Sequence, residues 1–278
     1  MLLFLLATSL CLVSVRADES VKAVQTKLRE GGFYFGNATG VYDSATAAAV
    51  TRFQIRQGLS ISGRLDSATA QALGVSTTTT EATEPAPEAG TWRRLRNGDM
   101  QFLKKLNAGE IAPPKVPGRS SPTPATAKVA TTTYTKTKTT EPAPPPPARA
   151  EAPDVYGKER LRDYVGAFVL AGLDPQIGAE LEFFADRVDY FGESQVSRDK
   201  VRRDLLRYDR QWPQRRFWLA GEVEVARQAD GKLRVTFPLR YELRNGSKRS
   251  SGKVSKTLVL RKAAEGDLEI VGVNERKS

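Results

Sequence analysis

The 278-residue chain contains no histidine, one cysteine and two methionines. Without histidine, Ser-His-Asp and Cys-His catalysis, His-ligated zinc and a His general base are all excluded. The single cysteine, Cys11, cannot build a thiolate metal site or an internal disulfide. We therefore expect no metal and no cofactor, and any catalysis would depend on carboxylates, Lys, Tyr, Ser or Arg.

Acidic residues are outnumbered, with 32 Asp and Glu against 43 Lys and Arg, which gives a formal net charge of +11. The excess is spread along the chain instead of forming one basic stripe, so nucleic acid is not an expected partner. Such a distribution favours weak attraction to an anionic wall or membrane surface. Hydrophobic residues make up 40% of the chain, which is enough to form globular cores.

Residues 1–17 are almost wholly apolar and end in Val15-Arg16-Ala17, which resembles a signal-peptidase site. The apolar run is too short for a membrane span, which needs about 20 residues. We predict a signal peptide at 1–17 and a protein exported to the periplasm, cell wall or extracellular space. A buried N-terminal helix is the alternative.

The composition divides the remaining chain into two globular parts and a linker. Residues 18–75 and 151–278 have mixed compositions, whereas residues 76–150 are rich in Thr, Pro and Ala. A segment with so few large apolar residues cannot offset the entropy of ordering, so we predict a disordered linker.

One stretch of the linker, residues 91–111, differs from the rest. Apolar residues there, such as Trp92 and Leu106, are interspersed with several Arg and Lys residues. A short helix is predicted at 97–108. Three interpretations are open for this Trp92 island: it packs on its own chain, it docks an envelope protein or an anionic membrane surface, or it has no fixed structure.

The N-terminal part contains two similar stretches, residues 42–50 and 65–73. Each has an Asp, at 43 or 66, that is suited to cap a helix, and each follows a glycine. The spacing of Thr46, Val50 and Phe53 indicates one face of a helix, and Val21, Val24 and Leu28 form a similar face before it. The sequence therefore predicts a small all-α module of three helices.

The same residues resemble the three-helix peptidoglycan-binding domain of bacterial wall-associated proteins. The matching positions are Val24-Gln25, Leu28, Gly32-Phe33-Tyr34, Gly36, Gly40, Tyr42, Thr46, Ala49-Val50, Phe53-Gln54, Gly58-Leu59, Gly63, Thr69 and Ala72-Leu73. The resemblance implies peptidoglycan as a partner. Tyr34 and Tyr42 are candidates for stacking on sugars, and Arg52 and Gln54 for hydrogen bonding to a peptide carboxylate. The alternative for all four is a structural role.

The C-terminal part changes from helical to strand periodicity. Helices are predicted at about 157–173, from Asp174-Pro175 through Phe184, and after Ser197 up to Trp212-Pro213. Residues 233–243 then alternate between apolar and polar, with hairpin turns at Asp230-Gly231 and Asn245-Gly246. We predict an α+β domain with helices on a curved antiparallel sheet.

This order of elements resembles the nuclear-transport-factor-2-like cone fold, and the segment 185–192 looks like the version attached to bacterial exported proteins. The fold includes both enzymes and binding domains, so it does not decide function. Candidate pocket residues are Asp189, Tyr190, Tyr208, Trp212 and Tyr241. Asp189 and Tyr190 are neighbours on a strand and should point to opposite faces.

Three functions are consistent with this organisation. The favoured hypothesis is an exported, non-catalytic peptidoglycan-binding protein that tethers its C-terminal ligand- or partner-binding domain to the wall. One alternative is a wall-targeted enzyme whose C-terminal domain uses a carboxylate/Tyr site. Another is an envelope scaffold that forms a homodimer through the C-terminal domain.

Overall fold

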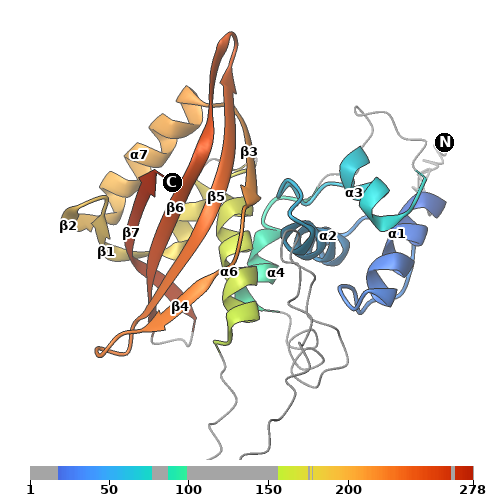
Figure 1. Cartoon of the computed structure of the whole chain (residues 1–278), viewed down its shortest axis with the longest axis horizontal. Coiled ribbons are helices and arrows are strands. Elements are labelled where there is room, and N and C mark those ends of the chain that lie inside the picture. The colour runs from blue at the N-terminus through green and yellow to red at the C-terminus, as the bar shows by residue number, and fades with distance from the viewer. Residues whose placement is uncertain are drawn as a thin grey trace, which may run out of the picture.

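The computed structural model describes residues 18–76, 87–98, 156–174, 176, 178–263 and 267–277. The expected signal peptide and most of the expected linker lie outside these residues. The described elements form a helical N-terminal module and an α+β C-terminal domain, which lie side by side (Figure 1). No helix among the described residues is long and apolar enough to cross a membrane.

The N-terminal module has the three predicted helices, α1 (Glu19–Glu30), α2 (Ser44–Gln57) and α3 (Ser67–Leu73). The carboxylates of Asp43 and Asp66 each accept a hydrogen bond at 2.8 Å, from the N–H groups of Thr46 and Thr69 respectively. These bonds satisfy backbone donors at the helix N-termini. Helix α2 ends at Gly58, whose φ of 65° favours glycine. The predicted caps are therefore confirmed.

Apolar side chains from the three helices and their loops form the core of the module: Val24, Leu28, Tyr34, Ala49, Val50, Phe53, Leu65, Ala70 and Leu73. The buried Gln25 amide ties α1 to α2, since it donates to the Val41 carbonyl and the Thr46 hydroxyl and accepts from Gly40 N–H. A buried amide with all of these partners costs little to desolvate.

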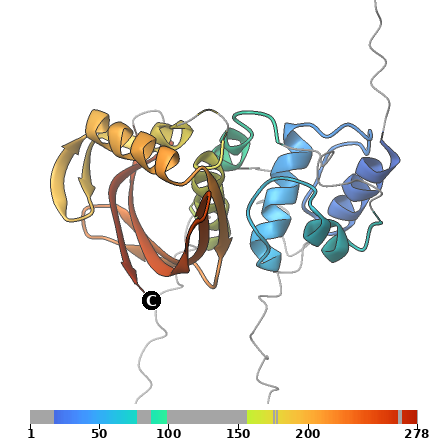
Figure 2. The same ribbon diagram turned by 90° about the horizontal axis from the view of Figure 1, so that it is seen from above.

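The C-terminal domain packs helices against a seven-stranded sheet with the order β2-β1-β7-β6-β5-β3, and β4 pairs with β5. Its helices are α6 (Lys158–Ala171), the 3₁₀ helix η2 (Ala179–Phe183) and α7 (Arg198–Gln211). Its strands are β1 (Phe184–Tyr190), β2 (Glu193–Ser197), β3 (Gln214–Leu219), β4 (Glu224–Arg227), β5 (Leu233–Asn245), β6 (Lys248–Lys262) and β7 (Leu268–Lys277). The sheet curves around the helices (Figure 2), which is the architecture implied by the resemblance to the cone fold.

Two details of this domain differ from the prediction. The sheet is mixed instead of antiparallel, because β7 returns between β1 and β6 and pairs in parallel with β1. The second predicted helix is also short, because the chain becomes extended at Phe184, which starts β1. Ile177, which was expected on that helix, lies outside the described residues.

The Trp92 island packs on its own chain through helix α4 (Trp92–Asn97). Trp92 and Leu95 are fully buried, and the Trp92 ring lies 5.1 Å from the Phe183 ring in η2. These two side chains are therefore not presented to an external partner. Helix α4 ends at Asn97, where the helix predicted at 97–108 was to begin. Residues 99–108 lie outside the described part of the chain, so that helix stays a prediction.

Candidate functional site

Both tyrosines proposed as sugar platforms contribute to the packing of the module. Tyr34 is buried, and its hydroxyl donates to the Asn37 carbonyl at 3.1 Å. The Tyr42 hydroxyl donates to the Gly63 carbonyl at 2.6 Å, and burial raises its pKa. The expected surface position of Tyr34 is wrong, and Tyr42 fixes the loop before α3.

Gln54 is fully buried and braces the loop between α2 and α3. Its amide donates to the Ser62 hydroxyl, the Arg64 carbonyl and the Thr69 hydroxyl, each at 3.0 Å. Its carbonyl oxygen accepts from the N–H groups of Ser62 and Gly63 at 3.0 Å. With all of its donors and acceptors used, Gln54 shapes the loop and is not exposed to a ligand.

Arg52 does not face the solvent, and it joins the module to the C-terminal domain. Its Nε lies 3.1 Å from Oδ2 of Asp163 on α6, and its Nη1 donates to the Phe33 carbonyl at 2.8 Å. Arg56 lies one turn along α2, with its Nη1 2.8 Å from Oδ1 of Asp163 and its Nη2 2.9 Å from Glu159. Burial alone would raise the pKa of Asp163, but Arg56 and Arg52 outweigh burial and lower it.

Close apolar and backbone contacts accompany this ion cluster. A Cβ atom on Gly166 of α6 would lie 2.1 Å from Cδ1 of Ile55, so the absence of a side chain lets α2 approach α6. The N–H of Ile61 donates to the carbonyl of Phe217 in the edge strand β3 at 2.8 Å. The module is thus in direct contact with both the helical layer and the sheet of the C-terminal domain.

Asp189 and Tyr190 have opposite environments on β1, although the pairing of this strand with β2 shifts register between Val188 and Tyr190. Asp189 is exposed on the outer face and accepts from Gln195 N–H at 3.1 Å. Tyr190 packs toward the core, with its ring 6.5 Å from that of Phe184, and burial raises its pKa to about 12. The sequence-predicted carboxylate/Tyr pair is therefore not assembled at these two positions.

The other three aromatic candidates also have structural contacts. The Arg215 guanidinium lies 5.6 Å from the Tyr208 ring, and burial raises the pKa of Tyr208 to about 12. Trp212 caps the C-terminus of α7, and its backbone N–H donates to the carbonyl of Tyr208. Tyr241 packs against the core of the domain.

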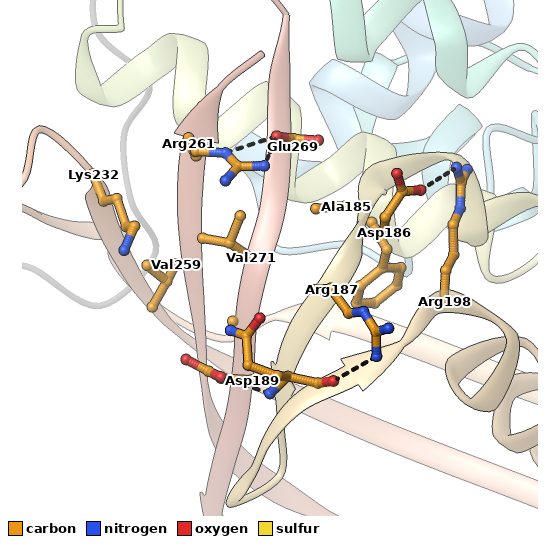
Figure 3. Close-up of a pocket in the computed structure, with 13 residues that line it drawn as sticks. Ala185, Asp186, Arg187, Asp189, Arg198, Lys232, Val259, Arg261, Glu269 and Val271 are labelled. Carbon is orange, nitrogen blue, oxygen red and sulfur yellow. Dashed lines mark hydrogen bonds and ion pairs between the residues drawn. The ribbon is translucent and has the colours of Figure 1, made fainter.

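A pocket of about 480 Å³ lies on the outer face of the sheet (Figure 3). Four of its charged side chains pair with one another: Nε of Arg261 donates to Glu269 at 2.8 Å, and Arg198 lies 4.0 Å from Asp186. Arg187 donates to the Gln195 carbonyl. The pocket is therefore polar and lined by charges of both signs.

A larger groove of about 970 Å³ lies between the two domains. The loop from Gly58 to Ala68 lines one side, and residues of β3 and β5 line the other. The sequence did not indicate this groove, because its two sides come from segments about 150 residues apart that only the docking brings together. The described residues include no cluster of acidic side chains suited to hold a metal ion.

A second buried carboxylate, which no sequence pattern indicates, belongs to Glu180 in η2. Burial is the main cause that raises its pKa to about 7, and the nearby Asp209 adds to the effect. Asp209 is itself paired with Arg215. Glu180 does not line either pocket described above.

Comparison with known families and structures agrees with the N-terminal architecture. Residues 17–73 match the family described as "Putative peptidoglycan binding domain". The N-terminal module is a peptidoglycan-binding domain of this type. No curated protein gives a significant match to the chain.

Similar solved structures cover the C-terminal part at low identity. ActVI-ORFA from Streptomyces coelicolor is 14% identical, with a TM-score of 0.37, over 42% of this chain and 95% of that chain. Aln2 from another Streptomyces species is 10% identical, with a TM-score of 0.38, over 45% and 92% of the two chains. Bd1075 from Bdellovibrio bacteriovorus is 16% identical, with a TM-score of 0.36, over 46% and 43%. Nothing about activity follows from similarities of this size.

Proposed function

We propose that this protein is an exported, non-catalytic peptidoglycan-binding protein that holds its C-terminal α+β domain at the bacterial cell wall. The observation that carries the proposal is the family match over residues 17–73. Positions that carried the sequence resemblance support it, since Val24, Val50 and Phe53 form the module core and Gly58 caps α2 in the left-handed conformation.

The docking between the domains refines how the C-terminal domain would be held. A flexible tether would let that domain move around the wall, whereas the contacts of Arg52, Arg56 and Ile61 fix it next to the module. Wall binding by the module would therefore place the C-terminal domain in one orientation.

Export and the lack of catalysis are supported by the sequence. Residues 1–17 have the pattern of a signal peptide, and the chain has no histidine. The opposite orientations of Asp189 and Tyr190 give no support to a carboxylate/Tyr reaction at those positions.

Co-sedimentation with purified peptidoglycan sacculi tests wall binding. The full chain without residues 1–17 should sediment with sacculi and stay in solution with chitin particles, which share the glycan linkage but lack peptide stems. Retention in the supernatant with sacculi would disprove the proposal.

The same incubation tests catalysis. Chromatography of the soluble fraction should show no released wall fragments beyond those of a protein-free control. A time-dependent product that disappears in an Asp189→Ala variant would instead support the enzyme alternative.

A further inference from the structure

The groove between the domains is a composite surface that neither domain forms alone. The buried Gln54 amide fixes the conformation of the module loop on one side. The hydrogen bond from Ile61 to Phe217 holds that loop beside β3, so the separation of the two sides is set by the fold. With a volume of about 970 Å³, the groove has room for a short peptide.

Three arginines that line the groove are available to an anionic ligand. Arg64 comes from the module, and Arg216 and Arg244 come from β3 and β5. All three are exposed, and none of their guanidinium groups forms an ion pair or hydrogen bond with another residue that the structure describes. Arginine binds carboxylates through two parallel N–H donors, so this set is suited to carboxylate groups.

The groove also offers negative charge, which restricts the class of ligand further. Glu88 is exposed at its edge, and Glu242 lies opposite Arg216 in the β3–β5 register. Glu242 makes only a loose contact with Arg240, at 3.7 Å. By contrast, Asp66 and Asp174, which also line the groove, already accept hydrogen bonds from backbone N–H groups. The free charges are therefore of both signs.

We propose that this groove binds the peptide stem of peptidoglycan, with Arg64, Arg216 and Arg244 holding its carboxylates and Glu88 or Glu242 an amino group. The inference rests on the proposed function, because it takes peptidoglycan as the ligand of the module. A stem peptide carries both carboxylate and amino groups, whereas the acetylated glycan is uncharged. A glycan strand in this groove would desolvate the guanidinium groups without giving them a counter-charge.

Titration calorimetry with a soluble disaccharide–tetrapeptide, released from sacculi by a muramidase, tests the site. The double variant R216A/R244A should bind this fragment at least about tenfold more weakly, because two charge-assisted contacts are lost. Arg64→Ala, on the opposite side of the groove, should weaken binding by roughly threefold or more. Arg234→Ala is the matched control, since Arg234 is exposed on the same strand and face as Arg244 but away from the groove.

The outcomes separate the groove from the wider proposal. If the wild-type chain sediments with sacculi but the double variant and Arg64→Ala bind the fragment with unchanged Kd, the groove is not the site. The inference also fails if peptide-free glycan competes as well as the fragment. The inference is also overturned if R216A/R244A still binds the fragment but no longer binds poly(glycerol phosphate). Equal melting temperatures for all variants exclude misfolding as the cause of a loss.

Discussion

Two sets of arginine–carboxylate contacts in this protein have similar distances but different surroundings. Between the domains, Arg52 and Arg56 contact Asp163, and the side chains of all three are at most 2% exposed. On the outer face of the sheet, Arg261 contacts Glu269 while 54% of the arginine side chain remains exposed. Water and salt screen the outer pair, so its net contribution to stability is small. The buried set depends on every partner being present, since a buried charge without its counter-ion is costly.

The ion cluster between the domains therefore contributes more to the choice of orientation than to the free energy of unfolding. A buried ion cluster need not be more stabilising than apolar packing of the same volume. It does penalise every alternative arrangement of α2 on α6 in which Asp163 would lack a guanidinium. We infer that this cluster selects one docked orientation, while Ile55, Trp92 and Leu95 supply the buried apolar area.

The largest expected effect comes from removing the shared carboxylate. Asp163→Ala removes the carboxylate that the buried guanidinium groups of Arg52 and Arg56 share. This variant should lower the free energy of unfolding by about 3–5 kcal/mol. Urea denaturation, monitored by circular dichroism, measures this change. The pKa of Asp163 is lowered in the folded state, so its contribution is present above its ordinary pKa and is lost as the pH falls through the folded value. If Asp163→Ala lowered the free energy of unfolding by less than about 1 kcal/mol, the buried and outer pairs would contribute equally to stability.

Glu180 is a buried carboxylate whose pKa moves in the opposite direction to that of Asp163. Its pKa is raised to about 7, so its neutral form stabilises the fold at low pH, and this stability is lost as the pH rises through about 7. Glu180→Gln should increase stability at pH 8 by up to about 3 kcal/mol and leave it nearly unchanged at pH 4. Thermal melts of both proteins at the two pH values measure this. An equal effect at both pH values would show that ionisation of Glu180 is not involved.

Gly166 tests whether the close approach of the helices depends on the missing side chain. Gly166→Ala places a methyl group 2.1 Å from Cδ1 of Ile55 and should destabilise the protein by about 1–3 kcal/mol. Ile55→Ala removes the clashing group. Gly166→Ala should therefore cost less stability in the Ile55→Ala background than in the wild-type protein. A double-mutant cycle from urea denaturation gives the coupling. Additive effects would contradict the contact.

The smallest effect is expected on the outer face. Glu269→Ala removes the carboxylate that contacts Arg261 and should change the free energy of unfolding by less than about 1 kcal/mol. The same denaturation assay in 1 M salt should reduce even this difference. If Glu269→Ala were as destabilising as Asp163→Ala, burial would not be what distinguishes the two sets.

The sequence predicted the features that depend on near neighbours. The caps at Asp43 and Asp66, the turn at Asn245-Gly246 and the alternation in β5 are local patterns, and each is confirmed. The pairing of Arg56 with Asp163 joins residues 107 positions apart, and the parallel pairing of β1 with β7 joins the first and last strands of the domain. Periodicity contains no information about such pairs, so the sequence leaves both a ligand contact and a structural role open for Arg52, and the structure shows the structural one.

The contact between α4 and α6 has a consequence for how the chain holds together. Arg160, near the start of α6, donates to the carbonyl of Arg96, near the end of α4, although 64 positions separate them in sequence. The contacts of α4 with α6 therefore hold residues on the two sides of this sequence segment together, without depending on the segment itself. A protein cleaved within that segment should remain one particle, with residues up to 98 and those from 156 held together without a covalent link.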